Sequence, residues 1–135
     1  MTDYLLLREI QPSQLYISAQ KLDALRRQYP HPTPENIPPI PVKRLGNRLF
    51  ATDGHTRAVL LCLNGYEKAR IEWETEKLDW DMYEICLQWC EQEGLLSLCD
   101  LVKRIIPHEE YEVKWYQRCE IMQKEVIERR VKKYQ

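Results

Sequence analysis

Apolar residues recur along this chain in two different periods, and the period changes near residue 76. Ala69, Ile71 and Trp73 alternate with charged residues, a pattern that predicts a half-buried strand. The part before residue 76 predicts strands at 5–10, 40–45, 48–52 and 69–74 and helices at 18–28 and 56–63. Beyond residue 77 the pattern predicts helices alone, at 79–93, 97–106 and 109–134.

Prolines, glycines and capping residues mark where these elements begin and end. Ser18 suits the N-cap of the first helix, and three prolines between residues 30 and 34 prevent its continuation. Gly46-Asn47 predicts a tight turn that joins 40–45 and 48–52 as a hairpin. The first of these strands is rich in proline, so we expect it at the edge of a sheet. Gly65 suits the left-handed position that follows a helix.

The order of these elements predicts an α+β fold. We expect a small mixed sheet with flanking helices over residues 1–76, followed by a helical C-terminal region over residues 77–135. Hydrophobic residues make up 44% of the 135-residue chain, which is enough for a packed core. The helical region could form a separate bundle or fold back on the core, and its three tryptophans favour burial against other residues.

Charge and hydropathy restrict the partners and the compartment. The net charge is −1, so the chain as a whole gives no electrostatic argument for binding nucleic acid. No apolar run reaches the roughly 20 residues that cross a bilayer, and the N-terminus lacks the basic stretch of a signal peptide. We therefore expect a cytoplasmic protein without membrane contact, and the sequence leaves its oligomeric state open.

The chain contains five cysteines without a CxxC pair: Cys62, Cys86, Cys90, Cys99 and Cys119. In a reducing cytosol we expect free thiols that pack as small apolar groups. Cys86 and Cys90 share a face of a predicted helix, and a metal ion there would need a further ligand such as Cys99 or His108. The short ligand spacings of zinc sites are missing, which favours buried thiols over a metal site.

One segment, Asp53-Gly54-His55-Thr56-Arg57, concentrates several chemical signals between a predicted strand and a predicted helix. A glycine at such a junction lets the backbone approach a ligand closely. The free N–H groups and the positive end of the helix dipole favour an anion there. His55 and Arg57 add side-chain donors, and the arginine fork suits phosphate oxygens. Helix capping by Asp53 is the alternative, purely structural interpretation.

The loop and its neighbours resemble the ParB/sulfiredoxin-like superfamily over about residues 5–75. In that family a strand leads into a proline turn and a helix, then a strand reading roughly P-I-x-V, a second strand and a signature loop that opens a helix. The matching segments here are Ile10-Gln11-Pro12-Ser13-Gln14, Pro39-Ile40-Pro41-Val42, Asp53-Gly54-His55-Thr56-Arg57-Ala58 and Leu63-Asn64-Gly65. The DGHxR form of the loop is similar to that of the free-serine kinase branch.

This resemblance implies a site for ATP or another nucleotide together with Mg²⁺. Phosphate contacts are expected from Gly54, His55, Thr56 and Arg57. Asp53 is expected beside Mg²⁺ or a hydroxyl substrate, so Asp53 and His55 are the catalytic candidates. Phosphoryl transfer depends mainly on positioning and charge stabilisation, which such a loop can supply.

Three further residues are candidates for supporting this site. Gln14 is one by family position alone. Lys43 and Arg44 lie on the neighbouring predicted strand, where their side chains point to opposite faces, so at most one of them reaches the loop. Solvent exposure is the alternative for both cations.

Several departures from the family leave the activity open. Sulfiredoxins carry a catalytic cysteine in the loop, whereas the nearest cysteine here, Cys62, lies inside the predicted helix. The kinases use a glutamate near the first turn, where this chain has Gln11, Ser13 and Gln14. ParB proteins continue into basic DNA-binding helices, whereas residues 72–93 hold eight acidic residues and one basic residue.

Two functions follow from these observations. The first is a nucleotide-binding protein that transfers a phosphoryl group to a small hydroxyl substrate. The alternative is a non-catalytic ParB-like regulator that binds DNA or a protein through its helical region. Nuclease activity ranks third, because the sequence shows no clustered carboxylates of the kind that a two-metal nuclease needs.

Overall fold

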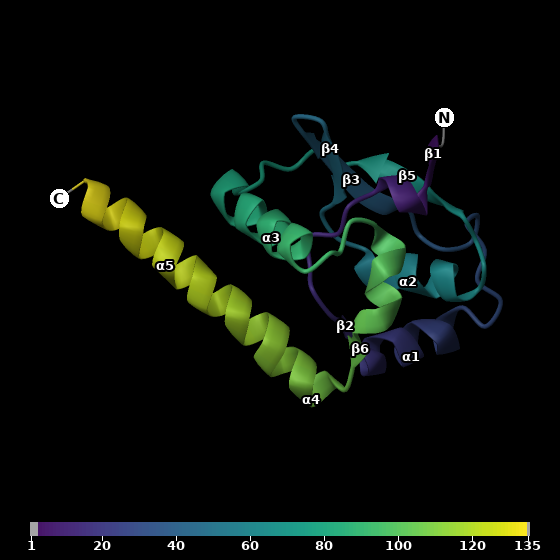
Figure 1. Ribbon diagram of the computed structural model, residues 1–135. Coiled ribbons are helices and arrows are strands. Elements are labelled where there is room, and N and C mark those ends of the chain that lie inside the picture. The colour runs from purple at the N-terminus through teal and green to yellow at the C-terminus, as the bar shows by residue number, and fades with distance from the viewer. Residues whose placement is uncertain (1–2, 135) are drawn as a thin grey trace.

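The computed structural model describes residues 3–134 and confirms the α+β fold, a small mixed sheet flanked by helices (Figure 1). Residues 1, 2 and 135 of the predicted regions lie outside the described residues. The main sheet has the strand order β1–β5–β3–β4. Its strands are β1 (Asp3–Leu6), β3 (Ile40–Leu45), β4 (Arg48–Ala51) and β5 (Lys68–Trp73). β3 and β5 run parallel, whereas the pairs β1–β5 and β3–β4 are antiparallel.

The predicted hairpin of β3 and β4 is confirmed, but the expectation that β3 lies at an edge is wrong. β3 pairs with β4 on one side and with β5 on the other. Pro41 is tolerated inside the sheet because pairing with β4 begins only at Val42, opposite Ala51. The Pro41 carbonyl still accepts a hydrogen bond from Thr52 N–H at 3.0 Å. The proline content of a strand therefore did not decide its place in the sheet.

The strand predicted at 5–10 is wrong in its second half. β1 ends at Leu6, and the next three residues form a 3₁₀ turn. Leu7 and Ile10 are three residues apart and both fully buried, whereas a strand would place them on opposite faces. Beyond this turn Gln11 forms a bridge to Phe50 of β4. The segment that follows is thereby held beside the end of β4, where the 53–57 loop begins.

The two helices of the first region match their predictions. α1 (Ala19–Gln28) begins after Ser18, whose hydroxyl caps its first turn. α2 (His55–Leu63) follows β4 almost directly, with Gly54 as its N-cap. Gly65 takes the left-handed position after α2, with φ at +81°.

The C-terminal region is mostly helical, as expected, with one strand that the pattern did not predict. Its helices are α3 (Trp80–Gln92), a 3₁₀ helix η2 (Leu98–Arg104), and a rod made of α4 (His108–Tyr111), a π-helical segment (Glu112–Gln117) and α5 (Arg118–Lys133). Before the rod, β6 (Ile105–Ile106) pairs in parallel with β2 (Ile17–Ser18). The expectation of helices alone after residue 77 is wrong, because a two-residue strand is too short to show alternation.

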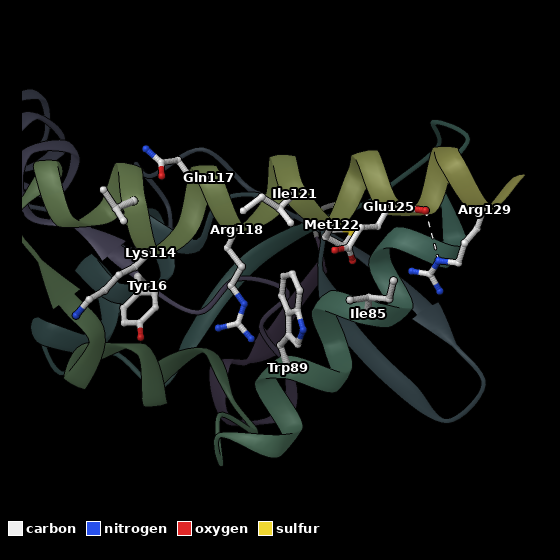
Figure 2. A pocket seen from close by; sticks show the side chains of 11 residues that line it. Tyr16, Ile85, Trp89, Lys114, Gln117, Arg118, Ile121, Met122, Glu125 and Arg129 are labelled. Atoms are coloured by element: carbon white, nitrogen blue, oxygen red, sulfur yellow. Dashed lines mark hydrogen bonds between the residues drawn. The ribbon is translucent and has the colours of Figure 1, made fainter. Parts of the chain in front are cut away.

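A cavity of about 730 Å³ lies between α3 and the rod (Figure 2). Ile85 and Trp89 of α3 line it together with Met122 of α5. Arg118 stacks on the Trp89 ring, with 4.2 Å between the guanidinium carbon and the ring centroid. No residue of the 53–57 loop lines this cavity.

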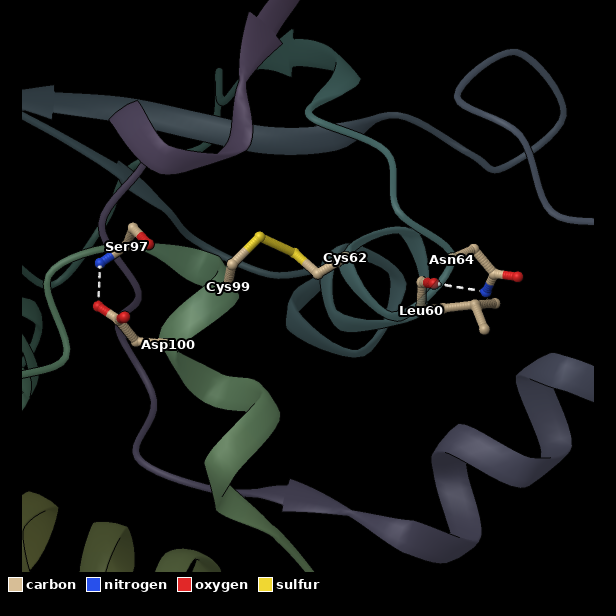
Figure 3. The surroundings of a disulfide bond; sticks show 6 residues. All are labelled: Leu60, Cys62, Asn64, Ser97, Cys99 and Asp100. Carbon is tan, nitrogen blue, oxygen red and sulfur yellow. Dashed lines mark hydrogen bonds between the residues drawn. A yellow bond between two sulfur atoms is a disulfide. The ribbon is translucent and has the colours of Figure 1, made fainter.

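The C-terminal region packs on the first region through aromatic contacts and a covalent bond. The rings of Phe50 and Tyr83 have centroids 5.7 Å apart. A disulfide joins Cys62 of α2 to Cys99 of η2 (Figure 3). The expectation of free thiols is therefore wrong for this pair. The two cysteines are 37 residues apart, and only the packing of η2 on α2 brings their Cα atoms to 5.7 Å.

The other three cysteines, Cys86, Cys90 and Cys119, are free, as expected. The division at residue 76 remains a prediction, and the contacts just described cross it. Within residues 3–134, no helix combines the length and the apolar character that crossing a membrane requires.

Candidate functional site

A cavity of about 380 Å³ opens at the loop between β4 and α2. The five residues of the predicted phosphate loop all line it, namely Asp53, Gly54, His55, Thr56 and Arg57. Helix α1 and the end of α4 supply most of the remaining wall. The volume lies within the range of about 300–1,000 Å³ that is usual for small-molecule sites.

Gly54 and Arg57 fit closely against each other in this cavity. Gly54 has a φ of +75°, which glycine adopts without strain. A Cβ atom at Gly54 would lie between 3.0 and 3.3 Å from three atoms of the Arg57 guanidinium group. Arg57 Nη1 donates to the Pro39 carbonyl at 2.6 Å, which holds the guanidinium over the glycine. The Nε and Nη2 groups of Arg57 donate to none of residues 3–134, so they remain available as donors.

The start of α2 supplies backbone donors to the same cavity. Its first helical hydrogen bond runs from Ala58 N–H to Gly54 O, at 3.0 Å. The N–H groups of residues 55–57 therefore precede the helical ladder and form the positive end of the helix dipole. Gly54 N–H differs from them because it donates to Asp53 Oδ1 at 2.7 Å.

His55 is the most constrained side chain of the site. It is 3% exposed, and its Nε2 accepts a hydrogen bond from Ser13 N–H at 2.9 Å. The Ser13 hydroxyl lies 3.4 Å from the same nitrogen but donates its single proton to Ala51 O at 2.7 Å. Nε2 is therefore unprotonated, and the neutral ring carries its proton on Nδ1. Nδ1 is buried and has no hydrogen-bond partner among residues 3–134.

Burial keeps the His55 ring neutral. It lowers the pKa of His55 from 6.5 to about 4, with the Asp53 carboxylate acting against this shift and the Arg57 cation adding to it. A buried donor without a partner costs about 1–3 kcal/mol. An anionic oxygen at Nδ1 would remove that cost, whereas a metal cation would meet a nitrogen that already carries a proton.

Two residues that the sequence did not indicate, Lys21 and Tyr111, complete the wall of the cavity. Lys21 Nζ lies 5.3 Å from the ring centroid of Tyr111 and 4.9 Å from that of Tyr116, whose hydroxyl it contacts. Burial raises the pKa of Tyr111, so its hydroxyl keeps its proton. Nothing in the local sequence separates Lys21 from other exposed lysines. The packing of α1 on α2 brings Lys21 to the loop, and the packing of α4 beside α1 brings Tyr111 there.

Gln14 lies in the wall of this cavity, so the structure brings it together with the loop. Its Nε2 donates to Tyr16 O at 2.8 Å and lies 3.4 Å from the Tyr111 hydroxyl. A smaller cavity of about 210 Å³ shares Gln14 and His55 with the first. The side chains of Gln14 and His55 therefore lie between these two cavities.

Lys43 and Arg44 do not line the cavity, so the structure does not bring them together with the loop. Lys43 Nζ donates to Glu74 O at 3.1 Å. The Arg44 guanidinium stacks on Trp73, 5.5 Å from the ring centroid. Lys43 and Arg44 are therefore held at the end of β5 and at the residue that follows it, which the central position of β3 places beside them.

Asp53 is exposed and is the carboxylate that lines the cavity. The described residues contain no group of three or more His, Cys, Asp or Glu side chains that could hold a metal ion. Mg²⁺ is usually held by one or two carboxylates together with substrate phosphates and water. Asp53 therefore fits a Mg²⁺ ion that arrives with a nucleotide, and does not fit an ion held by protein side chains alone.

No protein-family model matches the chain, and the comparison with curated proteins gives no match. Two solved structures overlap with part of it. Protein Atu1540 from Agrobacterium tumefaciens gives a TM-score of 0.45 at 14% identity, with 71% of this chain and 50% of that chain covered. A mutant free serine kinase in complex with ADP gives a TM-score of 0.47 at 17% identity, with 58% and 33% covered. The chain spans half or less of the length of each of these proteins.

Proposed function

We propose that this chain binds a nucleotide through its phosphate groups at the N-terminus of α2. The observation that carries the proposal is the buried His55 Nδ1–H, which has no partner among the described residues. A neutral ring with its proton on that nitrogen donates one hydrogen bond, and a phosphate oxygen accepts it. In this proposal His55 is a donor to phosphate and not a base.

The charges around the cavity support an anionic ligand. Lys21 and Arg57 line it as cations, with Asp53 as the anion, although the chain as a whole carries −1. The N–H groups of residues 55–57 add the positive end of the helix dipole. Backbone donors, a fork-shaped cation and a lysine together form the usual set for holding several phosphate oxygens.

The proposal extends to Mg²⁺ and to membership of the ParB/sulfiredoxin-like superfamily, on the residues quoted above. Mg²⁺ would supply charge neutralisation between the phosphates. Asp53 is the residue that would hold the ion or orient the hydroxyl of a small acceptor. His55, Arg57 and the backbone would hold the phosphates in place, which is most of what phosphoryl transfer requires of a protein.

Calorimetric titration with ATP and with ADP, each with Mg²⁺, tests the binding. Arg57→Ala should weaken nucleotide binding by about tenfold or more, because a hydrogen bond to a charged group contributes about 1.5–3 kcal/mol. Arg26→Ala is the matched control, since Arg26 pairs with Asp23 on the surface of α1 and does not line the cavity. Urea unfolding of each variant checks that it folds. Equal affinity of wild type and Arg57→Ala would contradict the proposal.

A second experiment separates binding from transfer. Wild type and Asp53→Asn are incubated with Mg²⁺–ATP and hydroxyl amino acids, and ADP release and the phosphorylated product are measured. If Asp53 holds the ion or orients the acceptor, the variant loses transfer while it still binds ATP. Binding without product in the wild type would limit the function to nucleotide binding. A complex with DNA that no nucleotide affects would favour the non-catalytic regulator instead.

A further inference from the structure

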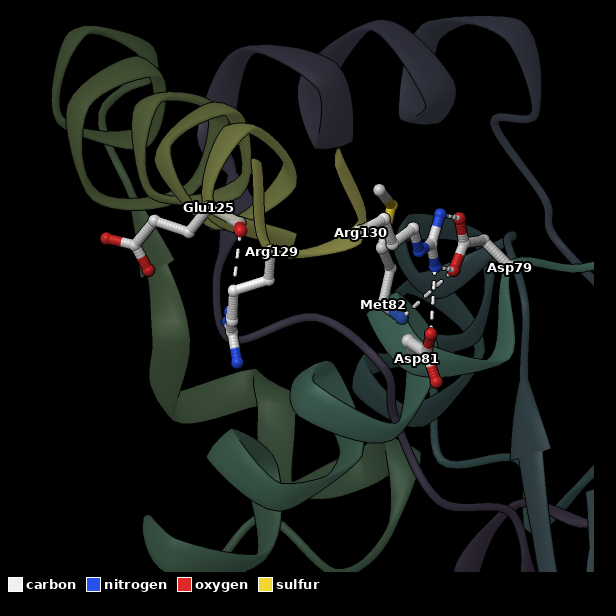
Figure 4. A network of polar contacts seen from close by, with 6 residues as sticks. All are labelled: Asp79, Asp81, Met82, Glu125, Arg129 and Arg130. Atoms are coloured by element: carbon white, nitrogen blue, oxygen red, sulfur yellow. Dashed lines mark hydrogen bonds and ion pairs between the residues drawn. The ribbon is translucent and has the colours of Figure 1, made fainter. Parts of the chain in front are cut away.

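The C-terminal rod buries one side against the rest of the molecule. Trp115, Met122 and Val126 are between 5% and 7% exposed. Near its end Arg130 forms a forked pair with Asp79 at the start of α3, Nη1 to Oδ2 at 3.0 Å and Nη2 to Oδ1 at 2.7 Å (Figure 4). The core contacts and this ion pair together fix how the rod is rotated, and therefore which side chains it presents to solvent.

The solvent side of the rod carries a stripe of residues at alternating spacings of four and three. This outer stripe consists of Val113, Gln117, Glu120, Lys124, Ile127 and Val131. Two of them, Val113 and Gln117, also lie at the rim of the cavity between the rod and α3. All six are exposed, and the apolar members Val113, Ile127 and Val131 are 56%, 52% and 52% exposed. Alternating four-and-three spacing is the pattern of the seam between two paired helices. Figure 1 shows the rod as one long, nearly straight helix along the side of the molecule.

The two charged residues in the middle of the outer stripe are not engaged within the chain. Glu120 and Lys124 are four residues apart, yet neither belongs to any ion pair among residues 3–134. Their neighbours Lys114 and Arg118 do form ion pairs, with Glu110 and Glu93. The outer stripe therefore combines apolar ends with one unpaired charge of each sign at its centre.

We infer that the outer stripe binds the outer stripe of a second copy of this chain, with the two rods antiparallel. An antiparallel pair centred at Met122 places Val113 against the partner's Val131 and Gln117 against the partner's Ile127. It also places Glu120 against the partner's Lys124. The two-fold axis repeats each of these contacts, as a closed symmetric dimer requires.

Charge selects the antiparallel arrangement over the parallel one. In a parallel pair in register, Glu120 would face the partner's Glu120, and Lys124 would face the partner's Lys124. Like charges at a helix seam disfavour that arrangement, whereas the antiparallel one makes two attractive contacts. The charges of the whole rod are divided in the same direction, with an acidic N-terminal half and a basic C-terminal half. Residues 109–120 hold four acidic and two basic residues, and residues 121–134 hold two acidic and five basic residues.

Sedimentation of the full chain over a range of concentrations tests this dimer. We expect a monomer–dimer equilibrium whose dissociation constant rises with added salt. Glu120→Lys should raise that constant by about tenfold or more, because each substitution creates two like-charge contacts. The double variant Glu120→Lys with Lys124→Glu exchanges the charges and should return dimerisation close to the wild-type level. In a parallel dimer the wild type and both variants would each have two like-charge contacts, so the dissociation constant would neither rise nor recover.

Two controls make the test decisive. Glu76→Lys makes the same change of charge at an exposed position before α3 and should leave the dissociation constant unchanged. Circular dichroism of each variant checks that the rod stays helical. A wild type that remains monomeric at every concentration overturns the inference and leaves the outer stripe to a different protein. A dimer that survives both Glu120→Lys and Val131→Glu overturns it as well.

Discussion

At the scale of single residues, Gly54 and His55 decide what the loop can hold. Gly54 provides the left-handed turn and the open space that the Arg57 guanidinium fills. His55 provides a neutral ring whose proton position is set by the Ser13 backbone. Gly54 contributes by lacking a side chain, and His55 contributes the proton on its Nδ1 atom.

Replacing Gly54 by alanine separates backbone strain from loss of the site. Gly54→Ala should lower the free energy of unfolding by about 1–2 kcal/mol, because an alanine in the left-handed region is strained. It should also weaken nucleotide binding, since its Cβ would displace the Arg57 guanidinium. Gly65→Ala is the control, with φ at +81° and no atom within 4 Å of the added Cβ. Urea unfolding and calorimetry measure both effects, and equal binding losses in the two variants would argue against the predicted role of Arg57.

The buried His55 predicts how stability changes with pH. Its folded pKa, about 4, lies below the ordinary value of 6.5, so the unfolded chain binds more protons between these two values. The contribution of His55 is therefore fully present above pH 6.5 and is lost as the pH falls towards 4. The loss amounts to at most about 3 kcal/mol. Urea unfolding at several pH values should show this slope, and His55→Gln should flatten it. An unchanged slope in His55→Gln would assign the titration to another group.

The sequence could predict the residues of the loop but not those of the opposite wall. Asp53 to Arg57 are contiguous, and their chemistry follows from a glycine, a helix start and two donors in a row. Lys21 reaches the cavity because α1 packs on α2, and Tyr111 because α4 packs beside α1; no local pattern records either contact. For the same reason, the placement of Lys43 and Arg44 could not be decided before β3 was known to be a central strand.

At the scale of elements, the junction between α2 and η2 lies at the opposite end of α2 from the 53–57 loop. The C-terminal turn of α2 is joined to η2 by the disulfide of Cys62 and Cys99. The hairpin, α1, α2 and α3 follow from periodicity, capping and glycine positions, and these predictions are confirmed. The disulfide and the β2–β6 pair depend on contacts between distant segments, so periodicity could not reveal them.

Reduction should destabilise the fold without altering the loop directly. Opening a cross-link between residues 37 apart should cost about 4 kcal/mol, because the unfolded chain regains the entropy of the closed loop. Thermal unfolding with and without a thiol reductant should show a lower melting temperature in the reduced sample. The double variant Cys62→Ser and Cys99→Ser should melt at the reduced value under both conditions. A wild type that melts identically in both would contradict the prediction.

At the scale of the whole molecule, the two regions predicted from the sequence share one interior. Phe50 of the sheet is fully buried and contacts Trp80 and Tyr83 of α3. Leu98 is fully buried as well, and its N–H donates to Ile10 O at 2.9 Å. The core therefore extends across residue 76, although the character of the sequence changes there.

A fragment that ends at residue 76 should fail to fold cooperatively. Removing α3 and η2 would expose Phe50 and the side of α2 that now packs on η2. We expect the full chain to unfold in urea in a single transition, and the fragment to show a broad, shallow change without near-ultraviolet circular dichroism. A fragment with its own sharp transition would support an independent first domain.

The pairing of β2 with β6 also sets an order in time. It brings His108 beside Ser18, with 2.8 Å between His108 Nδ1 and Ser18 Oγ, and so places Tyr111 against the cavity. During translation the loop at 53–57 leaves the ribosome well before Tyr111 does. A nascent chain would therefore display the 53–57 loop on a cavity whose wall at Tyr111 is still missing, so ligand affinity would rise to its full value only after Tyr111 had been synthesised and packed.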